Sequence, residues 1–162
     1  MPSDTPTTLS IVIPVHNEAG YLPGALAELF EEIAEVPASI TVLVAENGST
    51  DGTAQAVREL MGRYPELALL ELPTPDYGAA MREGFISSDG EWVVNFDIDY
   101  FSADFLRSVL SVGDGADLVL ASKRAEGADD RRGTVRRFAT WTFNQVLRFV
   151  LSSWVEITSA AI

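Results

Sequence analysis

Two aspartates, Asp97 and Asp99, follow an apolar run at residues 92–96 (WVVNF) and are separated by a single residue. Such a run predicts a buried strand that returns to solvent at its end. Because residues i and i+2 of an extended segment point to the same side, both carboxylates are expected to reach one hard, oxygen-seeking cation such as Mg²⁺ or Mn²⁺. The competing interpretation is that they cap the next helix, but Ser102 and Asp104 lie closer to its start.

Residues 47–53 (NGSTDGT) form a second polar cluster, directly after Glu46. On its own the cluster favours a turn and a helix N-cap, with Gly48 tolerating positive φ and Ser49 or Asp51 accepting hydrogen bonds from free amides. A ligand-binding role for this cluster depends on support from neighbouring loops.

His16, the only histidine, is a candidate general base. Since the sequence places no carboxylate or nucleophile against it, a role in structuring its loop is favoured. Gly78 and Gly84 are not part of a G-x-G-x-x-G or G-K-[ST] fingerprint. This argues against a Rossmann dehydrogenase or a P-loop protein.

Apolar runs alternate with helical patterns along the chain, which predicts βαβ units and a mainly parallel sheet covered on both faces. The predicted strands are 9–15, 40–45, 67–72, 92–96 and 117–121, and the predicted helices are 22–35, 51–63, 77–87 and 104–112. Ligands of such sheets bind beyond the carboxyl ends of the strands. Polar residues gather at those ends, at 17–18, 46–51, 97–99 and 122–124.

The composition, with 47% hydrophobic and 22% charged residues over 162 positions, is typical of one soluble domain. The absence of cysteine excludes disulfides and thiolate metal sites and is compatible with a reducing cytoplasm. Residues 1–8 are polar, lack a basic n-region and are expected to form a flexible N-terminus rather than a signal peptide.

Charge is distributed unevenly. Residues 1–122 carry 20 acidic and 4 basic side chains, whereas residues 123–162 carry 4 acidic and 7 basic ones. The basic residues accompany aromatic ones in a predicted helix, which suits either an anionic membrane surface or a solvated loop followed by a core helix. A transmembrane span is not expected, because Arg148 interrupts the apolar stretch.

Several short motifs occur together and in order along the chain. They are the segments 11–18 (IVIPVHNE), 44–53 (VAENGSTDGT), 77–84 (YGAAMREG), 95–99 (NFDID), 121–124 (ASKR), and Arg136-Arg137 with Asn144. With these motifs the chain resembles the family 2 glycosyltransferases of the GT-A fold, especially the branch of polyprenol-phosphate (dolichol-phosphate) mannose or glucose synthases. It departs from the family pattern at Glu46, Asn47, Tyr77 and Phe101.

The resemblance implies a three-layer α/β/α sandwich that forms one domain over 1–162. Residues 9–122 would bind the nucleotide sugar, and residues 123–162 would supply a basic loop and an amphipathic helix on the acceptor side. Because family catalytic domains continue past the position of Ile162, we expect either a compact or truncated member or a homo-oligomer that completes the site.

The resemblance also implies roles for individual residues. The catalytic roles fall to Asp99 and Arg124, and Asp97 and Asp99 would hold Mg²⁺ or Mn²⁺. The residues expected to bind the nucleotide sugar are Pro14, Val15, Glu18, Glu46, Asn47, Ser49, Gly78 and Asp97, and those expected to bind an acceptor phosphate are Arg124, Arg131, Arg132 and Arg137.

The implied reaction is displacement at the anomeric carbon, with inversion, from a GDP- or UDP-sugar to a polyprenyl phosphate or another lipid-linked acceptor. If the acceptor were a sugar hydroxyl, a base would be needed, and Asp129, Asp130 and Glu156 are the candidates. We expect a cytoplasmic protein, peripheral at the inner face of the membrane, and no nucleic-acid partner. A non-catalytic nucleotide or nucleotide-sugar binding module is the alternative; a nucleotidyltransferase is disfavoured because the chain lacks a G-x-G-T-R loop.

Overall fold

The computed structural model describes residues 6–121 of the chain, which divides into two compact units, Met1–Arg107 and Ser108–Ile162. A strand and a helix alternate through the first unit. Its elements are β1 (Thr8–Val15), α1 (Leu22–Ile33), β2 (Ser39–Asn47), α2 (Thr53–Met61), β3 (Leu67–Leu72), α3 (Tyr77–Ile86), β4 (Trp92–Asn95) and the start of α4 (Ala103–Val112). The second unit begins within α4 and continues into a 3-10 helix, Gly113–Gly115.

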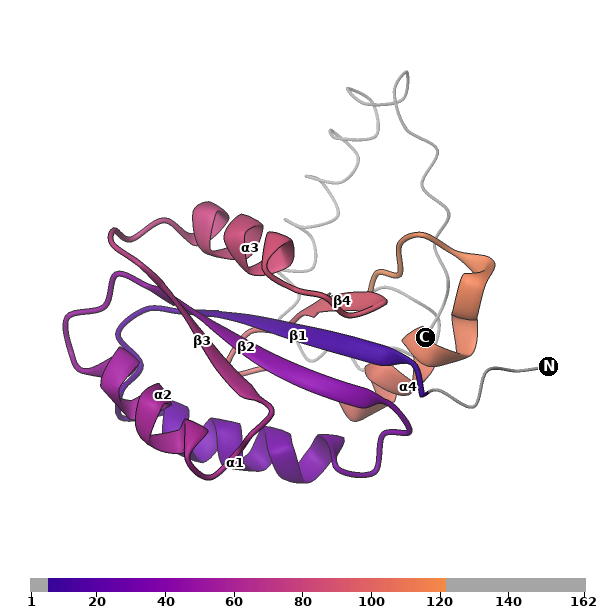
Figure 1. Ribbon diagram of the computed structural model, residues 1–162, viewed down its shortest axis with the longest axis horizontal. Helices are drawn as coiled ribbons and strands as arrows, with labels where there is room; N and C mark the ends of the chain where they lie inside the picture. The colour runs from indigo at the N-terminus through magenta and orange to yellow at the C-terminus, as the bar shows by residue number, and fades with distance from the viewer. Residues whose placement is uncertain (1–5, 122–162) are drawn as a thin grey trace, which may run out of the picture. The chain divides into compact units, whose positions relative to one another are not determined.

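The four strands form one parallel sheet in the order β3-β2-β1-β4. Helices α1 and α2 cover one face of this sheet and α3 covers the other (Figure 1). The predicted three-layer α/β/α arrangement is therefore confirmed. Because all four strands are parallel, their carboxyl ends lie on one edge, and the loops that follow them meet there.

The central strand β1 is buried along its length, as expected for a strand covered on both faces. Its side chains at Leu9, Ile11 and Ile13 are 0–1% exposed. Leu22 and Leu26 of α1 are fully buried at a spacing that places them on one helical face. Each such side chain contributes about 1.5–3 kcal/mol on burial, so the loops of the site extend from a rigid support.

Gly84 allows α3 to approach the sheet closely. A Cβ atom at this position would lie 2.5 Å from Val12 Cγ1 and 3.7 Å from Ala45 Cβ. Ala80, one helical turn earlier, is also fully buried against this part of the sheet. The small residues of α3 thus fix the height of the helix above β1 and β2, and with it the position of its first turn.

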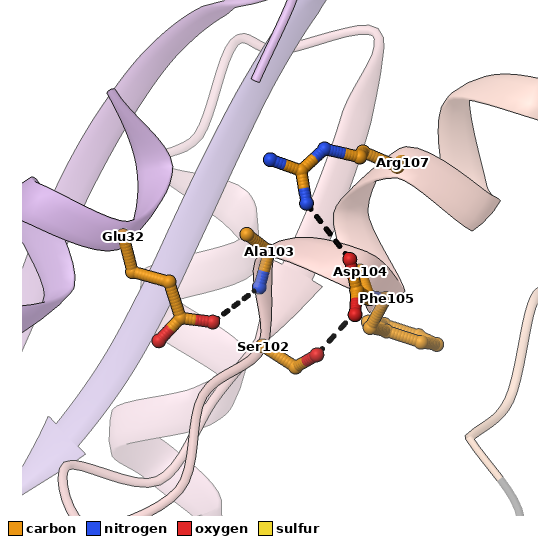
Figure 2. Close-up of polar contacts among 6 residues, drawn as sticks. All are labelled: Glu32, Ser102, Ala103, Asp104, Phe105 and Arg107. Atoms are coloured by element: carbon orange, nitrogen blue, oxygen red, sulfur yellow. Dashed lines mark hydrogen bonds and ion pairs between the residues drawn. The ribbon is translucent and has the colours of Figure 1, made fainter. Parts of the chain in front are cut away.

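Two hydrogen bonds and one ring contact fix the start of α4 within the first unit. The Phe105 amide donates to Ser102 Oγ at 3.2 Å, which confirms the expected capping role of Ser102. The Ala103 amide donates to Glu32 Oε1 at 2.7 Å, so a side chain of α1 also caps α4 (Figure 2). The Phe96 and Phe105 rings meet edge to face with centroids 6.1 Å apart. The segment 97–101 is therefore flanked by fixed residues, Phe96 on one side and Ser102 and Ala103 on the other.

Predicted and observed elements agree within about two residues at their ends, with one exception. The predicted strand at 117–121 is wrong, since these residues form no strand in the part of the chain that the structure describes. Leu118 and Leu120 are 69% and 55% exposed. An apolar run becomes a strand only where a neighbouring strand supplies hydrogen bonds, and within residues 6–121 none pairs with this one.

Candidate functional site

The loops after β1 and β2 are joined by hydrogen bonds around Asn17, whose φ of 56° is one that asparagine tolerates. Asn17 Oδ1 accepts from the Thr50 amide at 2.9 Å, so Nδ2 is the atom that faces His16 Nε2 at 3.0 Å. A ring nitrogen that accepts a hydrogen bond carries no proton. His16 therefore holds its proton on Nδ1 and donates it to the Asn47 carbonyl at 2.7 Å. This confirms the predicted loop-structuring role of His16.

Asp51 joins the same two loops at the start of α2. Its Oδ1 accepts from the Thr53 amide at 3.0 Å and from the Thr53 hydroxyl at 2.5 Å, and its Oδ2 accepts from the Ala19 amide at 3.0 Å. These hydrogen bonds, that from the Thr53 hydroxyl most strongly, lower the pKa of Asp51 below its ordinary value. Asp51 thus accepts from a free amide at the start of α2, as predicted, although the N-cap residue itself is Gly52.

An open pocket of about 550 Å³ lies where β2 and β3 end. Its volume is that of a small-molecule site, and its place at the carboxyl edge of a parallel sheet is where such sheets bind ligands. The residues that line it are Glu46, Gly48, Ser49, Thr50, Glu71, Leu72 and Pro73.

Two carboxylates give this pocket an acidic character. Glu46 and Glu71 are partners in the β2–β3 register, so their side chains lie on the same face of the sheet. Glu46 is only 4% exposed and accepts from the Ser49 amide. Glu71 pairs with Arg58 of α2. Carboxylates and hydroxyls suit the donor groups of a nucleobase or ribose and repel a phosphate.

The loop after β3 packs tightly against the loop after β2. Asn47 is 6% exposed, and its Oδ1 accepts from the Asp76 amide at 2.5 Å. Gly48 has a φ of +63°, and a Cβ there would lie 2.8 Å from the carbonyl carbon of Thr74 and 2.9 Å from the nitrogen of Pro75. The predicted positive φ at Gly48 is confirmed, and the close approach explains why the position also needs a small residue.

The Asp97-Ile98-Asp99 segment lies in a turn rather than in a strand. Strand β4 ends at Asn95, and the Tyr100 amide donates to the Asp97 carbonyl at 3.1 Å. Asp97 and Asp99 are exposed, while Ile98 between them is 8% exposed. The expected extended geometry is therefore wrong, because the turn redirects the chain toward α4; binding of one cation by both aspartates stays a prediction.

The first residue of α3 contacts this turn. Tyr77 Oη donates to Asp97 Oδ1 at 3.2 Å. Partial burial and then the negative charge of Asp97 raise the pKa of Tyr77, while a hydrogen bond from Asn95 opposes the shift. The tyrosine thus remains protonated and available as a donor.

The donor set of the turn fits a hard divalent cation. Asp97 and Asp99 offer only oxygen ligands, which Mg²⁺ and Mn²⁺ prefer. Within residues 6–121 no group of three or more acidic, histidine or cysteine side chains gathers at one point. Magnesium usually takes one or two carboxylates and completes its shell with water and phosphate oxygens, so a pair is sufficient.

The structure brings Glu46 and Ser49 together in the pocket and separates several other predicted binding residues from it. Pro14 and Val15 are buried at the end of β1, and Glu18 is half-buried with its amide donating to Thr53 Oγ1 at 2.9 Å. Asn47 turns toward the loop after β3, and Gly78 is exposed in the first turn of α3. The predicted Arg124, Arg131, Arg132 and Arg137 lie outside the described residues.

Sequence reasoning missed the contribution of β3. Glu71, Leu72 and Pro73 line the pocket although no polar motif marks them. The available signal was topological, since β3 was predicted to run parallel to its neighbours and must therefore end on the same edge.

Two glycosyltransferases match most of this chain in sequence. An uncharacterized glycosyltransferase of Mycobacterium tuberculosis is 31% identical over 118 residues, which are 72% of this chain and 49% of the relative. The undecaprenyl-phosphate 4-deoxy-4-formamido-L-arabinose transferase of Pseudomonas aeruginosa is 30% identical over 125 residues, 75% of this chain and 37% of the relative. This chain thus spans about half or less of the length of these relatives.

A solved glycosyltransferase structure and a glycosyltransferase family model also match this chain. The mannosyltransferase from Pyrobaculum calidifontis, solved in complex with GDP-Man and Mn²⁺, superposes with a TM-score of 0.58 at 27% identity, covering 70% of this chain and 34% of that one. The family model described as glycosyl transferase family 2 matches residues 10–159. The chain therefore belongs to glycosyl transferase family 2.

Proposed function

We propose that this chain is part of a metal-dependent inverting glycosyltransferase that moves a sugar from a GDP- or UDP-sugar to a polyprenyl phosphate or similar acceptor. The observation that carries the proposal is the acidic pocket at the ends of β2 and β3, on the same sheet edge as the exposed Asp97 and Asp99. The pocket would bind the base and ribose through Glu46, and the turn that carries Asp97 and Asp99 would face the diphosphate.

The charge of the diphosphate must be balanced by groups other than the described arginines. Arg58, Arg82 and Arg107 each pair with a carboxylate, and Arg63 lies over the Tyr64 ring at 5.3 Å from its centroid. A Mg²⁺ or Mn²⁺ ion held by Asp97 and Asp99 would stabilise the negative charge that develops on the departing nucleoside diphosphate. The metal complex of the P. calidifontis mannosyltransferase supports this part of the proposal.

In the proposed reaction an acceptor phosphate oxygen attacks the anomeric carbon from the side opposite the leaving group. A bond forms between that oxygen and the anomeric carbon. The bond from the anomeric carbon to the β-phosphate oxygen breaks, and its electron pair leaves with the nucleoside diphosphate. A phosphate monoester is already anionic near neutral pH, so the step needs little general-base help.

The acceptor side of the proposal depends on Arg124, Arg131, Arg132 and Arg137, whose planar guanidinium groups suit bidentate phosphate binding. The arabinose transferase of P. aeruginosa, named for undecaprenyl phosphate, supports a lipid-phosphate acceptor. Residues 6–121 contain no helix with the length and hydropathy of a membrane span. We propose that the basic segment 123–148 meets the lipid at the inner face of the membrane, and that a second copy of the chain helps to complete the site.

Transfer is tested by incubating the full chain with radiolabelled GDP-mannose or UDP-glucose, polyprenyl phosphate and Mn²⁺. The expected result is label in the organic phase, lost in Arg124→Ala although donor binding is retained. Arg63→Ala removes the same charge away from the site and should transfer normally. Donor binding without any transfer would contradict the enzyme proposal and favour a nucleotide-sugar binding module instead.

A further inference from the structure

We propose that Tyr77 is a positioning residue that fixes one oxygen of Asp97 and leaves the other oxygen for the cation and the donor. The inference rests on the proposed function of the Asp97 turn. Its starting point is the 3.2 Å hydrogen bond from Tyr77 Oη to Asp97 Oδ1, which joins two residues 20 positions apart in the sequence.

The backbone at Tyr77 is fixed by contacts of α3 and of the residue before it. It is the first residue of α3, and the preceding Asp76 caps this helix by accepting from the Ala79 amide at 2.9 Å. The Asp76 amide itself donates to Asn47 Oδ1 of β2. Farther along α3, Gly84 packs against β1. The backbone from which Tyr77 extends is therefore set by the sheet and by the loop that lines the pocket, not by the exposed turn.

The direction of this hydrogen bond follows from its two partners. A carboxylate oxygen accepts, so the Tyr77 hydroxyl is the donor. Because a tyrosine hydroxyl has a single proton, that proton is directed at Asp97 Oδ1.

The hydrogen bond preorganises the Asp97 carboxylate for binding. Asp97 is exposed, and without Tyr77 its side chain would rotate among several rotamers. Fixing Oδ1 directs Oδ2 and removes part of the entropic cost of binding. The same contact links the pocket loop, through Asn47 and α3, to the metal-binding turn.

The test is a double-mutant cycle on the full chain with Tyr77→Phe and Asp97→Ala, measured by calorimetric titration of GDP and of UDP with and without Mn²⁺. Tyr77→Phe should weaken Mn²⁺-dependent binding about tenfold, the effect of losing one hydrogen bond to a charged group. In the Asp97→Ala background, which has no acceptor for the hydroxyl, the same change should have an effect below about twofold. Tyr64→Phe, which removes a hydroxyl from a ring stacked on Phe30, should leave binding unchanged.

Equal losses from Tyr77→Phe in both backgrounds would show a general structural effect and overturn the inference, as would unchanged binding in the single variant. Failure of the proposed function has a different signature, because the wild-type chain would then bind neither nucleotide with Mn²⁺. Melting temperatures of the variants identify any loss that comes from unfolding.

Discussion

Replacing Gly48 with alanine should destabilise the fold and weaken nucleotide binding with it. The φ of +63° costs a residue with a Cβ about 1–2 kcal/mol. The new Cβ would also lie 2.8 Å from the Thr74 carbonyl carbon and 2.9 Å from the Pro75 nitrogen. These are backbone atoms that cannot rotate aside, and overpacking of this kind costs about 1–3 kcal/mol.

The expected net loss is about 1–4 kcal/mol, because alanine also stiffens the unfolded chain and returns about 1 kcal/mol. For a chain of this length the melting temperature should fall by about 2–16 °C. Urea unfolding followed by circular dichroism measures the free energy of unfolding. Calorimetric titration of the nucleotide measures the accompanying loss of affinity. Affinity should fall because a shift of Thr74 and Pro75 would move both the adjacent pocket residue Pro73 and the start of α3.

Gly52 is the matched control in the same loop. Its φ is +92°, yet nothing lies within 4 Å of a Cβ built there, so Gly52→Ala should cost only the backbone term of about 1–2 kcal/mol, less the same return from the unfolded chain. Gly20 has neither a positive φ nor a neighbour within 4 Å, and Gly20→Ala should be close to neutral. If Gly48→Ala were no more destabilising than Gly52→Ala, the close packing of the two loops would be refuted.

Three further predictions concern single side chains. Glu46→Gln keeps an acceptor for the loop amide but removes the buried charge, so calorimetry should show about tenfold weaker nucleotide binding at an unchanged melting temperature; full affinity would exclude Glu46 from the base site. Because the pKa of Asp51 is lowered from 3.8, its stabilising effect is present above that pH and is lost as the pH falls through the lower folded-state value. Asp51→Asn should therefore be less stable than wild type in urea at pH 7, and the difference should shrink progressively as the pH is lowered below 3.8; a constant difference would contradict this. Glu32→Ala leaves the Ala103 amide without its acceptor and should cost about 1 kcal/mol in urea unfolding, whereas Glu31→Ala on the exposed side of α1 should cost nothing measurable, and equal effects would refute the cap.

The sheet and its helices could be predicted because local patterns carried the necessary information. The apolar runs at 9–15 and 40–45 have the length of buried strands, and the cluster at 47–53 contains residue types that turns and caps require. The run at 117–121 looks similar, but whether it forms a strand depends on a neighbour that its own sequence does not specify.

Sequence patterns did not predict contacts between segments that lie far apart along the chain. Glu32 is an ordinary exposed glutamate on the α1 pattern, and only the fold places it against the amide that starts α4. Asn47 was expected to meet the nucleotide, yet its side chain is used to hold Asp76. The turn at 97–100 is closed by a backbone hydrogen bond from the Tyr100 amide to the Asp97 carbonyl, which the pattern of apolar residues does not encode.

The central claim is that this edge of the sheet binds a nucleotide-diphospho-sugar through a divalent cation at Asp99. Calorimetric titration of GDP- and UDP-sugars into the full chain, with Mn²⁺ and with a chelator, tests it directly. We expect binding that requires Mn²⁺ and that is lost in Asp99→Ala, whereas Asp89→Ala, at an exposed aspartate before the amino end of β4 and thus on the opposite edge of the sheet, should bind like wild type. Equal binding by Asp99→Ala and wild type, or no binding by either, would contradict the claim.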